Sequence, residues 1–258
     1  MKLSLLRWAL VGLACAGSVR FATVEANPQA ATPSAGQILS NYAAAIGGRD
    51  AITKITSRVS KGTIEVVGTP TQGTVESYAK APDKYVSIIN IPGYGEIRRC
   101  YNGASGWVDG PESGVQDLTG QDLSSMRRSS DFYQVLDIAK LYPSLTLKDT
   151  QDVAGHQAYV LEGDPGDGTL RRTYFDMVSG LMVRSEEEQG PANARQFTQI
   201  DIGDYRDTDG IKYPFTIGEA TTDGQTHQTV TLIVHLTDVR HNVPIDDSQF
   251  AKPPVRKP

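Results

Sequence analysis

Residues 74–103 read TVESYAKAPDKYVSIINIPGYGEIRRCYNG, and this stretch indicates an antiparallel β-sheet. Val75, Ser77 and Ala79 alternate with larger polar side chains, as in a strand that buries one face. Turn residues separate the strand-like runs, and Asn102-Gly103 is the strongest two-residue hairpin signal. Such short turns join antiparallel neighbours, because a parallel crossover needs a much longer connection. The strands expected here cover residues 74–80, 85–91 and 96–101.

The same pattern starts at Thr56 and continues to residue 240. Gly, Pro and Asp residues separate its strand-like runs, for example at Ala154-Gly155 and Asp209-Gly210. The whole series predicts about ten strands. The later strands are expected at residues 144–152, 156–163, 169–177, 180–188, 195–205, 211–221 and 226–240.

Two segments have helical rather than strand-like patterns. Ser34 can cap a helix that ends at Gly47-Gly48, and a short second turn follows over residues 51–55. Residues 121–141 lack strict alternation and end before Pro143, so they predict one or two helices inserted within the strand series. The apolar face of the first helix is formed by Ile38, Leu39, Tyr42, Ala45 and Ile46.

These elements predict a single α+β domain, mainly β, over residues 36–250. A strongly curved antiparallel sheet, covered on one face by the N-terminal helix and the central helical insert, would bury the apolar side chains. Residues 27–35 are small and contain Pro, so they predict a flexible leader. Residues 251–258 form a Pro-rich basic tail that is expected to fray.

Residues 1–26 have the order of a secretory signal peptide. Lys2 and Arg7 precede the apolar stretch Trp8–Gly17, which is too short to span a bilayer, and a small-residue cleavage site follows at Ala26. The protein is therefore expected to be exported to the periplasm. Two alternatives remain: lipid attachment at Cys15, and a short buried helix.

Removal of residues 1–26 leaves 232 residues with a net charge of −7, against −5 for the whole chain of 258. A chain this acidic has no broad attraction for nucleic acid or an anionic membrane surface. Cys100 would remain as the single thiol, expected as a small buried side chain rather than a reactive one. The sequence contains no Cys-x-x-Cys-His motif, so no c-type haem is expected.

The search for catalytic motifs nominates no residue. The sequence has no Gly-x-Ser-x-Gly and no phosphate-binding Gly-x-x-x-x-Gly-Lys-Ser/Thr motif. Asp207-Thr208-Asp209-Gly210 begins like a calcium loop, but it has no closing carboxylate and is read as a hairpin turn. His227, His235 and His241 are too far apart along a strand to bind one ion. No catalytic residue, metal or cofactor is predicted, and an enzyme is the weaker class.

Arginine doublets occur in two of the expected strands. Neighbouring strand residues point to opposite faces, so one Arg of each pair should face the helix-covered side. Such an Arg could lie at a cavity mouth, where it would meet an acidic head group or hold a lid helix. Alternatively, these strands lie at an open rim where both side chains reach water. The cavity-mouth candidates are Arg98, Arg99, Arg171 and Arg172, whereas Arg127-Arg128 is expected on the outer face of the insert.

Several local signatures occur together along the chain. Tyr78-Ala79-Lys80-Ala81-Pro82-Asp83-Lys84, Tyr101-Asn102-Gly103-x-x-Gly106-Trp107 and Tyr174-Phe175-Asp176-x-x-x-Gly180-Leu181 are three of them. With these motifs, residues 36–253 resemble the outer-membrane lipoprotein-sorting-protein-like group, which is related to the LolA and LolB lipoprotein carriers. The other signatures are Ile38-Leu39-x-x-Tyr42-x-x-Ala45-x-Gly47-Gly48, Tyr205-x-x-x-Asp209-Gly210-x-x-x-Pro214-Phe215 and His241-Asn242-Val243-Pro244-Ile245-Asp246-Asp247-x-x-Phe250.

The resemblance implies a LolA-like, half-open barrel that encloses an apolar cavity between sheet and helices. In the carriers, this cavity holds the acyl chains of lipoproteins in the periplasm. A monomeric carrier of lipid or lipoprotein acyl chains is therefore expected here, with the helices as a lid. The candidate cavity residues are Tyr85, Val86, Ile88, Ile89, Trp107, Met126 and Tyr133.

Two other functions stay open. The same apolar side chains could fill a closed core, and the protein would then be a non-catalytic cell-envelope interaction module that binds membrane proteins through its surface. A hydrolase acting on an apolar substrate is the third interpretation, although no sequence feature nominates its catalytic residue.

Overall fold

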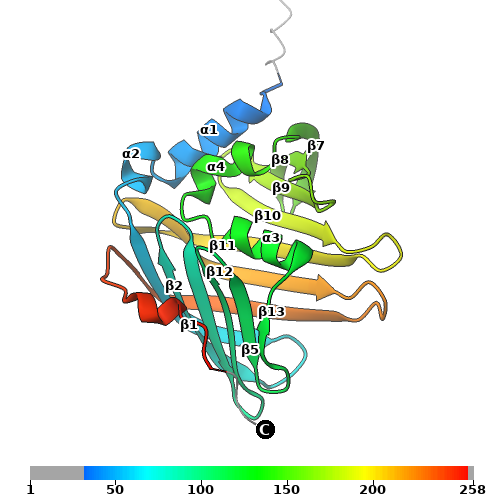
Figure 1. Ribbon diagram of the computed structural model, residues 1–258. Coiled ribbons are helices and arrows are strands. Elements are labelled where there is room, and N and C mark those ends of the chain that lie inside the picture. Colours follow the sequence, from blue (N-terminus) through cyan, green and yellow to red (C-terminus); the bar gives the residue numbers. More distant parts are fainter. Residues whose placement is uncertain (1–31, 255–258) are drawn as a thin grey trace, which may run out of the picture. The chain divides into compact units, whose positions relative to one another are not determined.

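The computed structural model describes residues 32–254, and these residues build one long antiparallel sheet with helices against one face (Figure 1). The compact unit that contains the sheet and helices begins at Pro33. The helices are α1 (Ala35–Ile46), α2 (Arg49–Ile52), α3 (Gly120–Ser129), α4 (Gln134–Leu141) and the 3-10 helix η1 (Asp247–Phe250).

The sheet has thirteen strands in the order β6-β5-β4-β3-β2-β1-β13-β12-β11-β10-β9-β8-β7. The first half comprises β1 (Ser57–Val66), β2 (Gln72–Lys80), β3 (Lys84–Ile91), β4 (Gly95–Asn102), β5 (Gly106–Gly110) and β6 (Gly114–Asp117). The second half comprises β7 (Thr146–Val153), β8 (His156–Gly163), β9 (Leu170–Asp176), β10 (Met182–Gln189), β11 (Gln196–Thr208), β12 (Ile211–Thr222) and β13 (Thr229–His241).

This strand order places the helical insert at the opening of the sheet. Neighbouring strands follow each other in sequence except where β1 pairs with β13, so β6 and β7 are the two edges. The segment that joins these two edges contains α3 and α4. Bulges at Lys61/Gly62, Leu147/Asp149 and Met182/Arg184 increase the local twist. The sheet therefore curves without closing, and α3 lies between its two halves (Figure 1).

α1 begins and ends where the sequence predicts. The Ser34 hydroxyl accepts a hydrogen bond from the backbone N–H of Gln37 (3.2 Å), and the Gln37 side chain accepts one from the N–H of Ser34 (2.8 Å). The helix ends at Gly47, whose φ is +145°. A Cβ atom at this position would collide with the carbonyl oxygen of Gly210 in the β11–β12 turn, so glycine lets the helix end pack against that turn.

One apolar core lies between the helices and the sheet. We call this side of the sheet the helix face. Tyr42 of α1 packs on Phe175 of β9 with ring centroids 5.1 Å apart, and Ile138 and Tyr142 contribute from α4 and the residue after it. The other buried members of this core are Ile38, Ile46, Ile52, Ile55, Leu161 and Ile211.

A second apolar cluster covers the opposite side of the sheet, the outer face, near β3 and β4. Residues 243–250, here called the C-terminal strap, place Ile245 and Phe250 over this cluster. Lys80 Nζ and Lys84 Nζ bind Asp247 of the strap at 2.8 Å and 3.0 Å. The sheet residues that the strap covers are Val59, Val86, Cys100 and Trp107.

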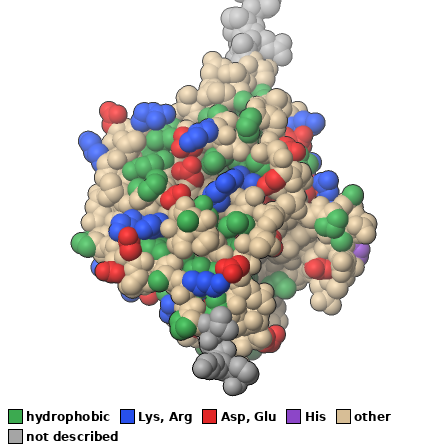
Figure 2. Space-filling model, viewed as in Figure 1, with side chains coloured by type: hydrophobic (Ala, Val, Ile, Leu, Met, Phe, Trp, Pro, Cys, Tyr) green, Lys and Arg blue, Asp and Glu red, His purple; other side chains and the backbone are tan. Residues whose placement is uncertain are grey.

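None of the helices within residues 32–254 has the length and hydrophobicity needed to cross a membrane. On the face shown in Figure 2, basic and acidic side chains are interspersed with scattered hydrophobic ones. On this face, then, the apolar side chains do not gather into one continuous surface patch.

The predicted fold class is confirmed: the protein is mainly β, with a strongly curved, half-open antiparallel sheet covered by an N-terminal helix and a central helical insert. The structure has thirteen strands rather than about ten, and the three without a predicted range are β1, β5 and β6. β5 and β6 carry too few residues to show alternation, and in β1 the apolar residues Val59 and Ile64 fall at opposite parities. The signal-peptide prediction, the alternative at Cys15 and most of the leader lie outside the described residues.

Candidate functional site

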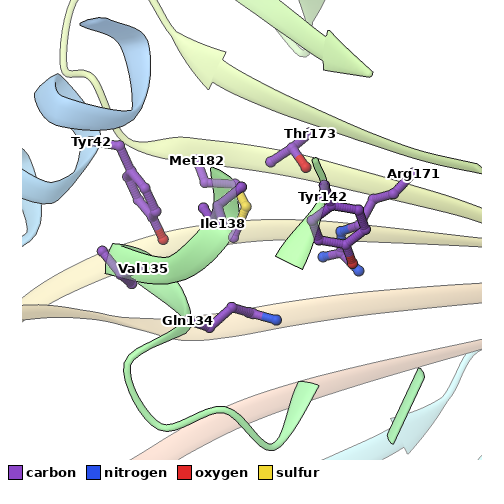
Figure 3. Close-up of a pocket in the computed structure, with 8 residues that line it drawn as sticks. All are labelled: Tyr42, Gln134, Val135, Ile138, Tyr142, Arg171, Thr173 and Met182. Atoms are coloured by element: carbon purple, nitrogen blue, oxygen red, sulfur yellow. The ribbon is translucent and has the colours of Figure 1, made fainter. Parts of the chain in front are cut away.

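A cavity lies between α1 and α4 on one side and strands β9 and β10 on the other (Figure 3). Its volume is about 20 Å³, which is room for one or two water molecules. Pockets that bind drug-sized ligands are more than ten times larger, at about 300–1,000 Å³. The cavity is therefore too small for such a ligand in this structure. Its lining residues are Tyr42, Gln134, Val135, Ile138, Tyr142, Arg171, Thr173 and Met182.

The α1 wall of the cavity is formed by Tyr42, which is buried against the sheet. Burial raises the pKa of Tyr42 to about 12, so this phenol stays neutral at physiological pH. The neighbouring Tyr205 of β11 donates its hydroxyl proton to the carbonyl oxygen of Met182 at 2.9 Å. This end of the cavity is apolar and contains no ionised side chain among its lining residues.

The β9 wall carries the charged member of the site. Arg171 Nη1 donates to Glu187 Oε2 on β10 at 3.1 Å, and the Arg171 guanidinium carbon lies 5.8 Å from the Tyr142 ring. Ser125 of α3 donates to the other carboxylate oxygen of Glu187 at 2.8 Å. Since Arg171 and Glu187 are only 18% and 14% exposed, both charges are held between sheet and insert.

Polar contacts also attach α3 to the loop between β8 and β9. Arg128 Nη1 donates to Asp167 Oδ2 at 2.6 Å. Hydrogen bonds from Thr169 and Arg128 hold the pKa of Asp167 below its usual value, although partial burial opposes them. Gln121 donates to the carbonyl oxygen of Asp167 at 2.7 Å and accepts from the N–H of Gly190 at 3.0 Å. The insert is thus held over the sheet largely by hydrogen bonds and ion pairs at α3 and by apolar packing at α4.

The predicted cavity residues of β3 and β5 are divided between the two faces of the sheet. Tyr85 and Ile89 lie on the helix face. Tyr85 pairs with Ala79 of β2, which in turn pairs with Arg58 of β1, so these side chains share one face of the sheet. Arg58 in turn stacks on Phe132 of the insert, with its guanidinium carbon 5.4 Å from the ring. None of the predicted β3 and β5 residues lines the cavity.

Val86, Ile88 and Trp107 correct the sequence interpretation. They lie on the outer face, where the C-terminal strap covers them with Ile245 and Phe250. The physical reason is the two-residue period of a strand, which turns Val86 away from the face that Tyr85 occupies. β3 has apolar residues at both odd and even positions, so both of its faces are covered. The helices cover one of these faces, and the C-terminal strap covers the other.

The predicted residues of the insert are buried, but they do not line the cavity. Met126 of α3 is 6% exposed. Tyr133 precedes α4, packs against the helix-side core and donates its hydroxyl proton to the carbonyl oxygen of Ile55 at 3.1 Å. Both residues attach the insert to the rest of the fold and do not face the cavity.

The arginine doublets divide as strand alternation predicts. Arg171 faces the helices and lines the cavity, whereas Arg172 faces outward to Glu162, Glu186 and Glu188. Arg98 also lies on the outer face and binds Glu96 at 2.7 Å, whereas Arg99 lies on the helix face and is exposed. Of these four residues, Arg171 is the one that belongs to the cavity.

Arg128 differs from its expected position on the outer face of the insert. Arg127 is exposed, but Arg128 is only 6% exposed, because its ion pair with Asp167 lies under the insert. Glu186, Glu187 and Glu188 are half-buried and bind Arg171 and Arg172 instead of pointing freely into solvent. No local pattern shows these ion pairs, since the partners are 16 to 39 residues apart.

Sequence patterns identify few of the residues that line the cavity. Tyr42 was expected on the apolar face of the first helix, but its partners on α4 and β9 come from distant segments. One sequence pattern points to this part of the sheet: Arg171 and Thr173 alternate with Arg172 in a strand that follows the helical insert. Alternation together with the insert points to this face, but not to the cavity itself.

The comparisons with known proteins concern the fold. No protein-family model matches the sequence, and no curated protein matches it. Solved structures do match, and they have the LolA-like architecture described above. The expected resemblance to the outer-membrane lipoprotein-sorting group is therefore confirmed for the fold.

Two of these structures match most of this chain. A LolA superfamily protein from Nitrosomonas europaea is 14% identical, with a TM-score of 0.53 over 86% of this chain and 99% of its own. A domain from Vibrio parahaemolyticus, named for outer-membrane lipoprotein sorting, is 14% identical, with a TM-score of 0.51 over 76% of this chain and 90% of its own. At this identity the likeness defines the fold and no residue of the site.

Proposed function

We propose that the protein is a periplasmic carrier or sorting factor that binds lipid or lipoprotein acyl chains between its sheet and its helices. The observation that carries this proposal is the cavity on the helix face, whose α1 end is walled by Tyr42, Val135, Ile138 and Met182. The lipoprotein-sorting name of a structure with the same fold supports it. The protein acts by binding, without catalysis.

The cavity, at about 20 Å³, has to enlarge to hold a chain. Each CH₂ group transferred from water contributes about 0.8 kcal/mol, so a chain of a dozen carbons offers several kcal/mol for separating α4 from the sheet. The α3 contacts that must break are hydrogen bonds and ion pairs, and each neutral bond contributes about 0.5–1.5 kcal/mol net. The bound chain replaces the apolar packing that α4 loses against the sheet, so the free energy of transferring the chain from water is set mainly against these polar contacts.

Saturable binding of a fluorescent fatty acid to the purified protein tests this function. Val135→Trp places a large ring in the cavity and should lower the affinity at least tenfold, whereas Ala139→Trp, on the exposed side of α4, should change it less than twofold. Circular dichroism and thermal unfolding establish that both variants fold. Absence of binding by the wild type, together with a ligand-free native mass after purification from a membrane-containing extract, would refute the proposal.

Export rests on the N-terminal sequence pattern. Mass spectrometry of the protein from its cell envelope should give a mature N-terminus at Asn27. A lipid-modified N-terminus at Cys15 would instead show that the protein is anchored in the membrane.

The small cavity volume favours a second candidate, a cell-envelope interaction module with a filled core. Such a module would bind membrane proteins through its surface and no acyl chain. Cross-linking in intact cells that captures protein partners, combined with no fatty-acid binding in solution, would support this module over the carrier.

A further inference from the structure

The cavity has an apolar end and a polar end. Tyr42 and Val135 lie at one end in Figure 3, while Arg171 and Thr173 lie at the other. A ligand that fills such a space with matched chemistry is an amphiphile with a defined direction. Its chain would point toward α1, and its head group would lie against β9.

Arg171 has donors to offer at the polar end. Its guanidinium carries five N–H donors, and within residues 32–254 the hydrogen bond it makes goes from Nη1 to Glu187. Its neighbour Arg172, on the outer face, is surrounded by Glu162, Glu186 and Glu188. The arginine at the cavity thus has one carboxylate partner, shared with Ser125, where the outer arginine has three.

A second buried guanidinium, that of Arg128, lies beside the cavity, although Arg128 does not line it. Arg128 lies with its guanidinium carbon 6.0 Å from the Tyr142 ring, the same ring that Arg171 approaches. Its Nη1 binds Asp167, but Nε and Nη2 are buried without a hydrogen-bond partner among the described residues. Buried donors without acceptors are unfavourable, and an acceptor-rich group next to Tyr142 would relieve this.

We propose that the cavity selects single-chain amphiphiles with an anionic head, a carboxylate or a phosphate ester, and that Arg171 binds this head. The inference rests on the proposed function and specifies its ligand class. Guanidinium groups bind carboxylates and phosphates through paired, charge-assisted hydrogen bonds, so the head would be recognised by geometry as well as charge.

Competition against a fluorescent fatty acid at pH 8 tests the head group at constant chain length. Dodecanoate and dodecyl phosphate should each bind the wild type at least tenfold more tightly than methyl dodecanoate. Arg171→Gln should remove this preference, lowering affinity for dodecanoate about tenfold and leaving the ester unchanged. Arg172→Gln is the matched control, because it changes the adjacent residue on the opposite face; it should keep the preference.

The outcomes separate the two proposals. If the wild type binds none of the three ligands, the carrier function itself is wrong. If it binds all three equally, or if Arg171→Gln keeps the preference, the carrier function stands and the head-group inference is overturned. Displacement by millimolar inorganic phosphate or acetate would also overturn it, since the site would then bind a free anion. Arg171→Lys, which keeps the charge, should bind dodecanoate with intermediate affinity if Arg171→Gln does not fold.

Discussion

A buried histidine links the stability of the fold to pH. The side chain of His241, on β13, is 2% exposed, and its Nδ1 lies 3.3 Å from Asp209 Oδ2. Burial and the Arg58 guanidinium lower its pKa, and Asp209 opposes them only in part. Protonation is therefore easier in the unfolded chain, whose histidine titrates near 6.5. This contribution to stability is present above about pH 6.5 and is lost as pH falls through the lower pKa of the folded state.

His241→Gln removes that titration, so the free energy of unfolding should fall less between pH 7.5 and pH 5 than in the wild type. Urea unfolding at both pH values measures the difference. His235→Gln, on an exposed position of the same strand, is the control and should behave like the wild type. An equal loss of stability in His241→Gln and the wild type would show that His241 does not carry this pH dependence.

Two adjacent arginines of α3 should differ sharply in their contribution to stability. Arg128→Met leaves the Asp167 carboxylate without its partner under the insert. Breaking a fully buried pair costs about 3–5 kcal/mol, and because Asp167 is 23% exposed we expect about 2 kcal/mol here. Arg127→Met should stay within about 0.5 kcal/mol of the wild type, since Arg127 is exposed. Equal urea midpoints for the two variants would contradict a structural role for the Arg128 pair.

At the scale of elements, local patterns define helices and strands but not which face of a strand meets which partner. Ser34, the apolar face of α1 and Gly47 suffice to predict the first helix, because all the interactions that start and stop it are local. Tyr85 and Val86 are neighbouring hydrophobic residues of β3, and alternation alone does not determine which of the two faces the helices. That choice is made by Phe132 of the insert and Phe250 of the strap, which lie far away in sequence.

The C-terminal strap is the element that decides the outer face of β3 and β4. Cys100 is buried beneath it, with its Sγ 3.5 Å from the carbonyl oxygen of Phe250, and burial raises its pKa to about 12. The thiol should therefore be almost unreactive in the folded protein. Phe250→Ala should speed up modification of Cys100 by a thiol reagent and lower stability by about 3–5 kcal/mol.

Asp247→Asn tests the strap without disturbing its core, because it weakens only the contacts to Lys80 and Lys84. It should raise the labelling rate of Cys100 by a smaller factor than Phe250→Ala. Lys252→Ala, which breaks an exposed ion pair with Asp117 just after the strap, is the control. Labelling that is fast already in the wild type would mean that the strap does not hold over Cys100.

At the scale of the whole molecule, strand order couples the insert to the cavity. β6 and β7 are the free edges of the sheet, and the chain must pass from one edge to the other through α3 and α4. Sequence predicts an insert within the strand series but not this position, because it depends on the pairing of β1 with β13 at the two ends of the chain. Because of that pairing, the insert connects the two edges of the sheet and also forms one wall of the cavity.

The cavity is too small for an acyl chain and lies next to the insert, whose helix α3 is held by polar contacts, so we predict that opening of the insert limits ligand entry. Gln121→Ala removes two hydrogen bonds that hold the start of α3, to Asp167 and Gly190. At about 0.5–1.5 kcal/mol each, their loss should increase the open population about tenfold. Amides of residues 120–141 should then exchange hydrogen faster while those of β11 and β12 do not change, and a fluorescent fatty acid should associate about tenfold faster.

Arg127→Gln, exposed on the same helix, should alter neither rate. Faster exchange with an unchanged association rate would mean that ligands reach the cavity by a route other than the insert.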